Sequence, residues 1–128
     1  MNSSRKIFVA AALLVATSPV AHALDLYTSL FQAQLGSKIT CGIVNTSTKP
    51  IEVSAAIEDY STGSDITGLT TCPVSPATLP AGTGCVAATN TAGNVGYCHF
   101  TTATSKVHAA LLVVNSTGDV TSTLEAAK

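Results

Sequence analysis

The four cysteines constrain this chain more than any other feature of its sequence. They stand at Cys41, Cys72, Cys85 and Cys98, with spacings of 31, 13 and 13 residues. The close Cys-x-x-Cys pairs of structural zinc sites and of thiol exchange do not occur. An even number of cysteines in a small exported chain indicates disulfides, so we expect two bridges. Three pairings are possible, and the expected order of the strands favours Cys41–Cys98 with Cys72–Cys85.

The first 23 residues have the three parts of a cleavable signal peptide. Arg5 and Lys6 supply positive charge, ten apolar residues follow at 7–16, and Ala21 and Ala23 are the small residues that a signal peptidase reads. The alternative is a membrane anchor, but a spanning helix needs about 20 apolar residues, twice this length. We therefore expect cleavage after Ala23 and a periplasmic or extracellular protein.

The composition of the remaining part, residues 24–128, predicts one small β-domain. Removing residues 1–23 from 128 leaves 105, enough for a single modest core. These residues include four lysines, no arginine and seven acids, a net charge of −3. Nucleic-acid binding therefore lacks an electrostatic basis, and anionic membrane surfaces are disfavoured. No second apolar run is long enough for stable membrane insertion. Ser and Thr account for 28 of the 105 residues, and Thr favours strands.

Alternating apolar and polar residues predict most of the strands. The clearest alternation is at 51–58, which places Ile51, Val53, Ala55 and Ile57 on one buried face. Residues 38–43 alternate in the same way, and the turn composition at 45–50 predicts that these two segments form a hairpin. A first strand is expected within 27–35, with a short amphipathic helix as the alternative. Further strands are expected at 65–70, 85–89, 97–102, 106–115 and 120–126, the first and last of these at sheet edges. The proline-rich segment 72–85 reads as a loop that a Cys72–Cys85 bridge would close.

This pattern predicts a small antiparallel β-sandwich of seven to eight short strands, with an immunoglobulin-like architecture by analogy. The second and the penultimate main strands of such a sandwich face each other across the core, and Cys41 and Cys98 occupy those places. The chain has no tryptophan, however, and Tyr97 directly precedes Cys98 instead of standing two residues before it. No tyrosine corner is therefore expected, and fold alone does not determine function.

Several short motifs also resemble those of small exported bacterial proteins of uncharacterised function. They are Ile39-Thr40-Cys41, Asn45 to Ile51, Leu79-Pro80-Ala81-Gly82, Tyr97-Cys98-His99-Phe100 and Lys106-Val107-His108-Ala109. The resemblance covers most of residues 24–128. It implies a β-sandwich in a bacterial envelope or an extracellular setting, and it supplies no catalytic or binding residues.

The candidate metal ligands are His99 and His108. If 97–102 and 106–115 form a hairpin with a two-residue loop at Ala103-Thr104, the two rings lie directly opposite each other. A cross-strand histidine pair could bind copper or zinc, although no third ligand is evident. The competing interpretation is two half-exposed residues of a sheet.

The sequence gives little support for catalysis. Glu52 and Glu58 share a face but lie roughly 20 Å apart at strand rise, too far for a pair of glycosidase carboxylates. Asp59 and Asp65 flank a turn without the spaced ligands of a calcium loop. No Gly-x-Ser-x-Gly elbow and no phosphate-binding glycine loop occur. We expect no enzyme and no cofactor.

Together these observations predict an exported, non-catalytic domain, a structural or interaction module of the cell envelope or secretome. A partner protein would bind through the edge strands. The alternative is a small periplasmic metal- or ligand-binding protein that uses His99 and His108. The sequence leaves the partner and the oligomeric state open.

Overall fold

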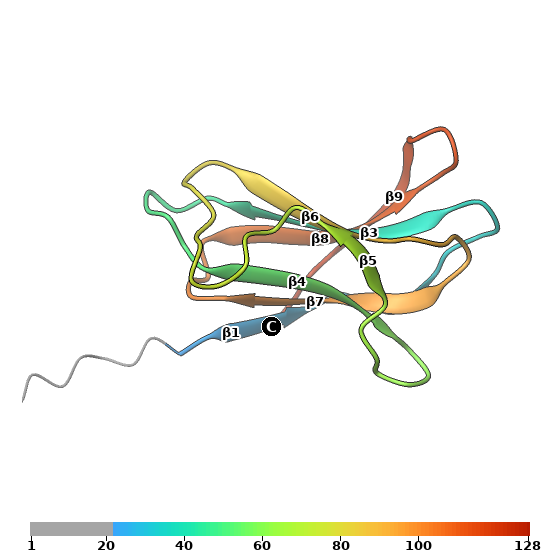
Figure 1. The fold of residues 1–128 in the computed structure, drawn as a ribbon, viewed down its shortest axis with the longest axis horizontal. Helices are drawn as coiled ribbons and strands as arrows, with labels where there is room; N and C mark the ends of the chain where they lie inside the picture. The colour runs from blue at the N-terminus through green and yellow to red at the C-terminus, as the bar shows by residue number, and fades with distance from the viewer. Residues whose placement is uncertain (1–21) are drawn as a thin grey trace, which may run out of the picture.

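A computed structural model describes residues 22–128 of the chain (Figure 1). Ala21 and most of the predicted signal peptide lie outside these residues, and Ala23 is exposed just before the first strand. The described part is all-β, as predicted, with no helix and therefore none that could cross a membrane. Its nine strands are β1 (Leu24–Tyr27), β2 (Phe31–Gln32), β3 (Lys38–Asn45), β4 (Val53–Asp59), β5 (Thr67–Thr70), β6 (Gly84–Thr89), β7 (Val95–Thr102), β8 (Val107–Val114) and β9 (Val120–Glu125).

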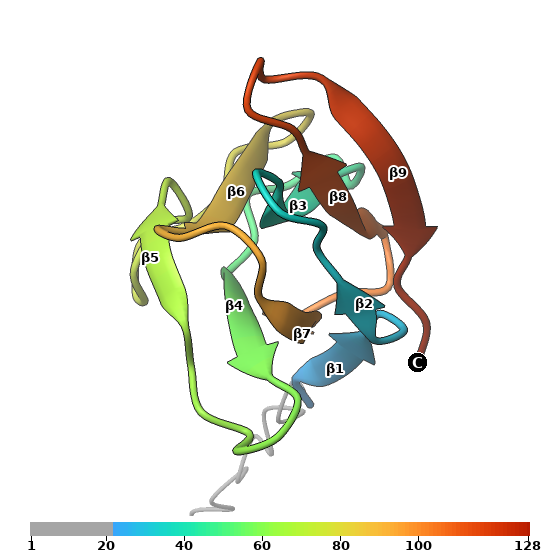
Figure 2. The ribbon, with the colours of Figure 1, turned by 90° about the vertical axis from the view of Figure 1, so that its right-hand side faces the viewer.

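The strands form two antiparallel sheets. In the first sheet β7 is central, with β4 on one side and the short strands β1 and β2 on the other. The second sheet has the order β5-β6-β3-β8-β9. Figure 2 shows the two groups of strands facing each other. The predicted edge segments at 65–70 and 120–126 are confirmed as β5 and β9, the two edges of the second sheet.

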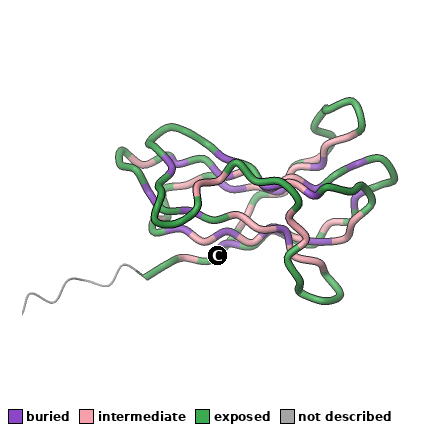
Figure 3. The backbone as a smooth tube through the Cα atoms, viewed as in Figure 1, coloured by how far each residue is buried: buried purple, intermediate pink, exposed green. Residues whose placement is uncertain are grey.

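The core lies between the inner faces of the sheets. Alternation places every second residue of β7 inside, and Phe100 at its centre is fully buried. The same buried cluster contains Ile57 of β4, Ile39 and Ile43 of β3, and Leu111 of β8. Figure 3 shows that buried residues concentrate in the strands, whereas the connecting loops are mostly exposed.

Two disulfides connect the parts of this structure, in the pairing favoured above. Cys41 of β3 is bonded to Cys98 of β7, so this bridge joins the two sheets through the core. Cys72 is bonded to Cys85 at the start of β6 and attaches the loop after β5 to the second sheet. No free cysteine remains among residues 22–128.

The predicted hairpin between 38–43 and 51–58 is wrong, because β3 and β4 lie in different sheets. Both edges of β3 are occupied, one by β6 and the other by β8, so β4 has no place beside it. The intervening loop crosses between the sheets around the buried Asn45 side chain. Its Nδ2 donates to the carbonyls of Lys49 and Leu79, and its Oδ1 accepts from the Ser47 backbone N–H. A turn composition does not distinguish such a crossing from a hairpin.

The predicted hairpin between 97–102 and 106–115 is also wrong. β4 and β1 occupy the two edges of β7, and β8 crosses to the second sheet, where it lies between β3 and β9. The described residues form nine strands instead of the expected seven to eight, and the immunoglobulin-like part of the prediction is not confirmed.

The expected first strand is divided in two, and the helical alternative does not form. Between β1 and β2 the chain remains attached to β7 at Thr28. The Thr28 backbone N–H donates to the carbonyl of Cys98, and its Oγ1 accepts from the Cys98 N–H. The side-chain oxygen thus replaces a backbone acceptor where the strand is interrupted.

Candidate functional site

The two candidate metal ligands do not form a pair. His99 of β7 lies between Tyr27 of β1 and Ala56 of β4 in the first sheet, whereas His108 of β8 pairs with Val44 in the second. The hairpin that would have placed them opposite each other is absent, which corrects the prediction. No group of three His, Cys, Asp or Glu side chains within 22–128 is arranged to hold a metal ion.

His99 instead lies between two carboxylates on the outer face of the first sheet. Its Nδ1 is 2.8 Å from Oε1 of Glu58 on β4, and its Nε2 is 3.0 Å from Oδ1 of Asp25 on β1. The Tyr27 ring stacks on the imidazole at 4.5 Å between centroids. The Tyr97 hydroxyl donates to Glu58 Oε2 at 2.5 Å. We call these five residues the His99 cluster.

Within the His99 cluster, the histidine and the two carboxylates shift one another's pKa values towards the charged forms. Partial burial alone would lower the pKa of His99, but the hydrogen bonds to Asp25 and Glu58 and their charges raise that pKa above its ordinary 6.5. The Tyr97 hydroxyl and then His99 lower the pKa of Glu58, and His99 and Thr101 lower that of Asp25. His99, held between two carboxylates, therefore connects β1 to β4 across β7.

Both imidazole nitrogens of His99 are occupied by carboxylates, one from each neighbouring strand. The His99 cluster thus anchors β1 to the rest of the first sheet. Sequence reasoning missed Asp25 and the contact with Glu58. Alternation places His99 on the outer face, but the pairing of β1 with β7 leaves no local signal in the sequence.

The remaining candidate acids have separate partners. Glu52 accepts from the Ser75 hydroxyl at 3.0 Å, away from the His99 cluster that contains Glu58. Asp59 caps its own turn by accepting from the Ser61 and Thr62 backbones, and Asp65 accepts from the Thr67 N–H. These contacts are the local hydrogen bonds by which Asp side chains stabilise turns.

The free edge of β4 is the second notable feature of the first sheet. The backbone C=O and N–H groups of Ile57 point away from β7. The C=O accepts a hydrogen bond from the Ile66 N–H, and the N–H donates to Thr67 Oγ1. Ile51 does the same with Leu79, through two backbone hydrogen bonds. Because backbone groups alternate in direction along a strand, the N–H and C=O groups of Val53 and Ala55 also point away from β7. Within residues 22–128 no hydrogen bond satisfies their N–H and C=O groups on that side.

This gap arises because the neighbouring segment changes sheets. A regular antiparallel strand with Asp65 opposite Glu58 would bring Cys72 opposite Ile51, but Leu79 is there instead. The chain leaves β4 after residue 66 and pairs with β6 as β5. The Cys72–Cys85 bridge then holds the following loop to the second sheet. Residues 72–78 thus bypass the edge.

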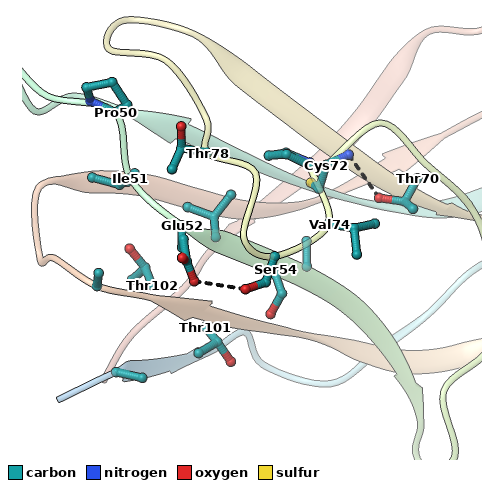
Figure 4. A pocket seen from close by; sticks show the side chains of 16 residues that line it. Pro50, Ile51, Glu52, Ser54, Thr70, Cys72, Val74, Thr78, Thr101 and Thr102 are labelled. Atoms are coloured by element: carbon teal, nitrogen blue, oxygen red, sulfur yellow. Dashed lines mark hydrogen bonds between the residues drawn. The ribbon is translucent and has the colours of Figure 1, made fainter. Parts of the chain in front are cut away.

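A groove of about 730 Å³ lies along this open edge, within the range of ligand-binding sites. Figure 4 shows β4 and the residues just before it on one side, and the loop that carries Val74 and Cys72 on the other. The lining is mainly apolar, and Glu52 is the one charged residue among those that line the groove in the described part of the chain. Val53 is 6% exposed, so its open backbone groups lie in a recess.

In comparisons with known proteins, this chain matches no protein family, no curated protein and no solved structure.

Proposed function

We propose that this chain is an exported, non-catalytic interaction module that binds an extended segment of another protein along the open edge of β4. The observation that carries the proposal is the pair of residues Val53 and Ala55. Their outward backbone groups have no hydrogen-bond partner among residues 22–128, while both ends of the same edge are paired. Unpaired backbone groups in a recess are costly, and an added strand satisfies them.

The setting that we propose is the cell envelope or the extracellular space. Two disulfides are typical of proteins that mature in an oxidising compartment, and the sequence of residues 1–23 favours export. We assign the His99 cluster a structural role, because its imidazole is engaged on both nitrogens in connecting strands.

Site-directed cross-linking in the native source tests this function. A photo-reactive residue in place of Val74, which is 80% exposed beside the groove, should form a covalent adduct with one defined partner protein. The same residue in place of Leu35, fully exposed and outside the groove lining, should not.

A second substitution makes the test specific for the edge. Ala55→Pro removes an outward N–H without removing a ladder bond to β7, so the protein should fold while the Val74 adduct is lost. Thr123→Pro is the matched control. Thr123 lies on β9, at the edge of the second sheet. The Ala126 N–H donates to the Ala109 carbonyl of β8, and N–H groups alternate in direction along a strand, so the N–H of Thr123 points away from β8. An adduct that survives Ala55→Pro, or that forms equally from Leu35, would contradict the proposal.

A further inference from the structure

We infer that the ligand of the β4 edge is an antiparallel peptide strand of about five residues, with apolar side chains facing the groove and a basic side chain opposite Glu52. This inference rests on the proposed function and specifies the chemistry of the partner. It concerns a single extended segment, because residues of the loop 72–78 line the side of the groove that faces β4.

The length and direction follow from the two ends of the gap. The open stretch between the contacts of Ile51 and Ile57 contains residues 52–56, roughly 17 Å of strand. The bridges at both ends, Ile51 with Leu79 and Glu58 with Asp65, are antiparallel. A ligand strand in the same direction continues that pattern, and antiparallel pairing is the more stable kind.

The register follows from the open backbone groups. In an antiparallel pair, one ligand residue exchanges two hydrogen bonds with Ala55, and the residue two positions further exchanges two with Val53. The side chains of these two ligand residues point to the same face as Val53 and Ala55, towards the apolar lining that includes Val74. Small or β-branched apolar side chains suit these positions.

The charge preference comes from Glu52. Its side chain is exposed at one end of the groove, where the Ser75 hydroxyl holds the carboxylate. The net charge of −3 on residues 24–128 adds to the local negative charge. A lysine or arginine on the ligand residue directly opposite Glu52 would form a cross-strand ion pair, whereas an acid there would be repelled.

The probe for the test is the peptide acetyl-Thr-Val-Thr-Val-Lys-Thr-amide, titrated into the purified 24–128 protein and followed by NMR. Its two valines are placed opposite Ala55 and Val53, and its lysine opposite Glu52. N-methylation of both valines should weaken binding by at least about tenfold, because it removes the two donors to β4. N-methylation of the central threonine, whose N–H points away from β4, is the control and should leave binding nearly unchanged.

Replacing the lysine of the probe by glutamate should weaken binding by about fivefold, and Glu52→Gln should abolish most of that preference. Equal effects of N-methylation at the valines and at the central threonine would overturn the inferred register. If the NMR signals of Val53 and Ala55 do not shift with about 1 mM probe, the inference that the ligand is an extended peptide strand is overturned. If the Val74 cross-link still forms in that case, the proposed function survives. Association of the protein with itself through β4, detected by sedimentation, would assign the edge to a second copy and contradict the inference.

Discussion

At the scale of single residues, His99 and His108 show how strongly the role of a side chain depends on the strands beside it. The same residue type at position 108 lies exposed on the second sheet, whereas His99 is fixed between Asp25 and Glu58 with Tyr27 stacked on its ring. The sequence singled out both histidines for the same reason. Their different roles depend on which strands lie beside them.

The raised pKa of His99 predicts a pH dependence of stability. A histidine whose pKa is higher in the folded state stabilises fully below its unfolded pKa of about 6.5, and this contribution is lost as pH rises through the raised value. The lowered pKa values of Asp25 and Glu58 limit the stabilisation at low pH. Their contribution is present above about pH 4.5 and is lost as pH falls through the lowered values.

The difference in free energy of unfolding between wild type and His99→Gln should therefore be largest between about pH 4.5 and 6.5, and it should shrink at higher pH. Urea unfolding at a series of pH values measures it. His108→Gln, which replaces an exposed histidine of the second sheet, is the matched control. A His99→Gln difference that stays constant from pH 5 to 9 would show that the ion pairs contribute nothing specific.

At the scale of elements, the strands could be located from the sequence, but their partners could not. Alternation correctly located the segments of β3, β4, β7 and β8, and it correctly placed Cys41, Val53 and Ile57 on buried faces, because the period of two is a local property. Both expected hairpins were wrong, because whether a loop turns back or crosses between sheets depends on which edges are already occupied. The Cys41–Cys98 and Cys72–Cys85 pairing was predictable because it requires only that two buried faces meet and that an irregular loop be closed.

The open edge of β4 could not be predicted either, because it also depends on which strands pair. The segment 65–70 was expected as an edge strand, and it is one, but it is the edge of the other sheet. Its first residues still contact β4 through Ile66, so the change of sheet within a few residues creates the gap. Nothing in the local composition marks that change.

The two disulfides should contribute unequally to stability. In the chain-entropy account, the Cys41–Cys98 bridge closes the longer loop and contributes about 4 kcal/mol, whereas Cys72–Cys85 contributes about 3 kcal/mol. Removing Cys41 and Cys98 also leaves space in the core, because both are fully buried. The double variant Cys41→Ala/Cys98→Ala should therefore lose more free energy of unfolding than Cys72→Ala/Cys85→Ala. Urea unfolding of both variants decides this, and the reverse order would contradict the assignment of Cys41–Cys98 as the bridge between the sheets.

At the scale of the whole molecule, the fold is a sandwich with unequal sheets. The second sheet has five strands, and the first has β7 at its centre with only one strand position on each side. The narrow sheet carries both the His99 cluster, which ties its strands together on the outer face, and the free edge of β4. An added strand would widen the narrower sheet, so the proposed binding also completes the architecture.

Amide hydrogen exchange at β4, followed by NMR in the free protein and with the valine–lysine probe peptide, tests this account most directly. In the free protein the N–H groups of Val53 and Ala55 should exchange fast, while those of Ser54 and Ala56, which point towards β7, should be protected. With the peptide, Val53 and Ala55 should become protected as well. Equal protection of all four amides in the free protein would show that the edge is already paired, and would contradict the account.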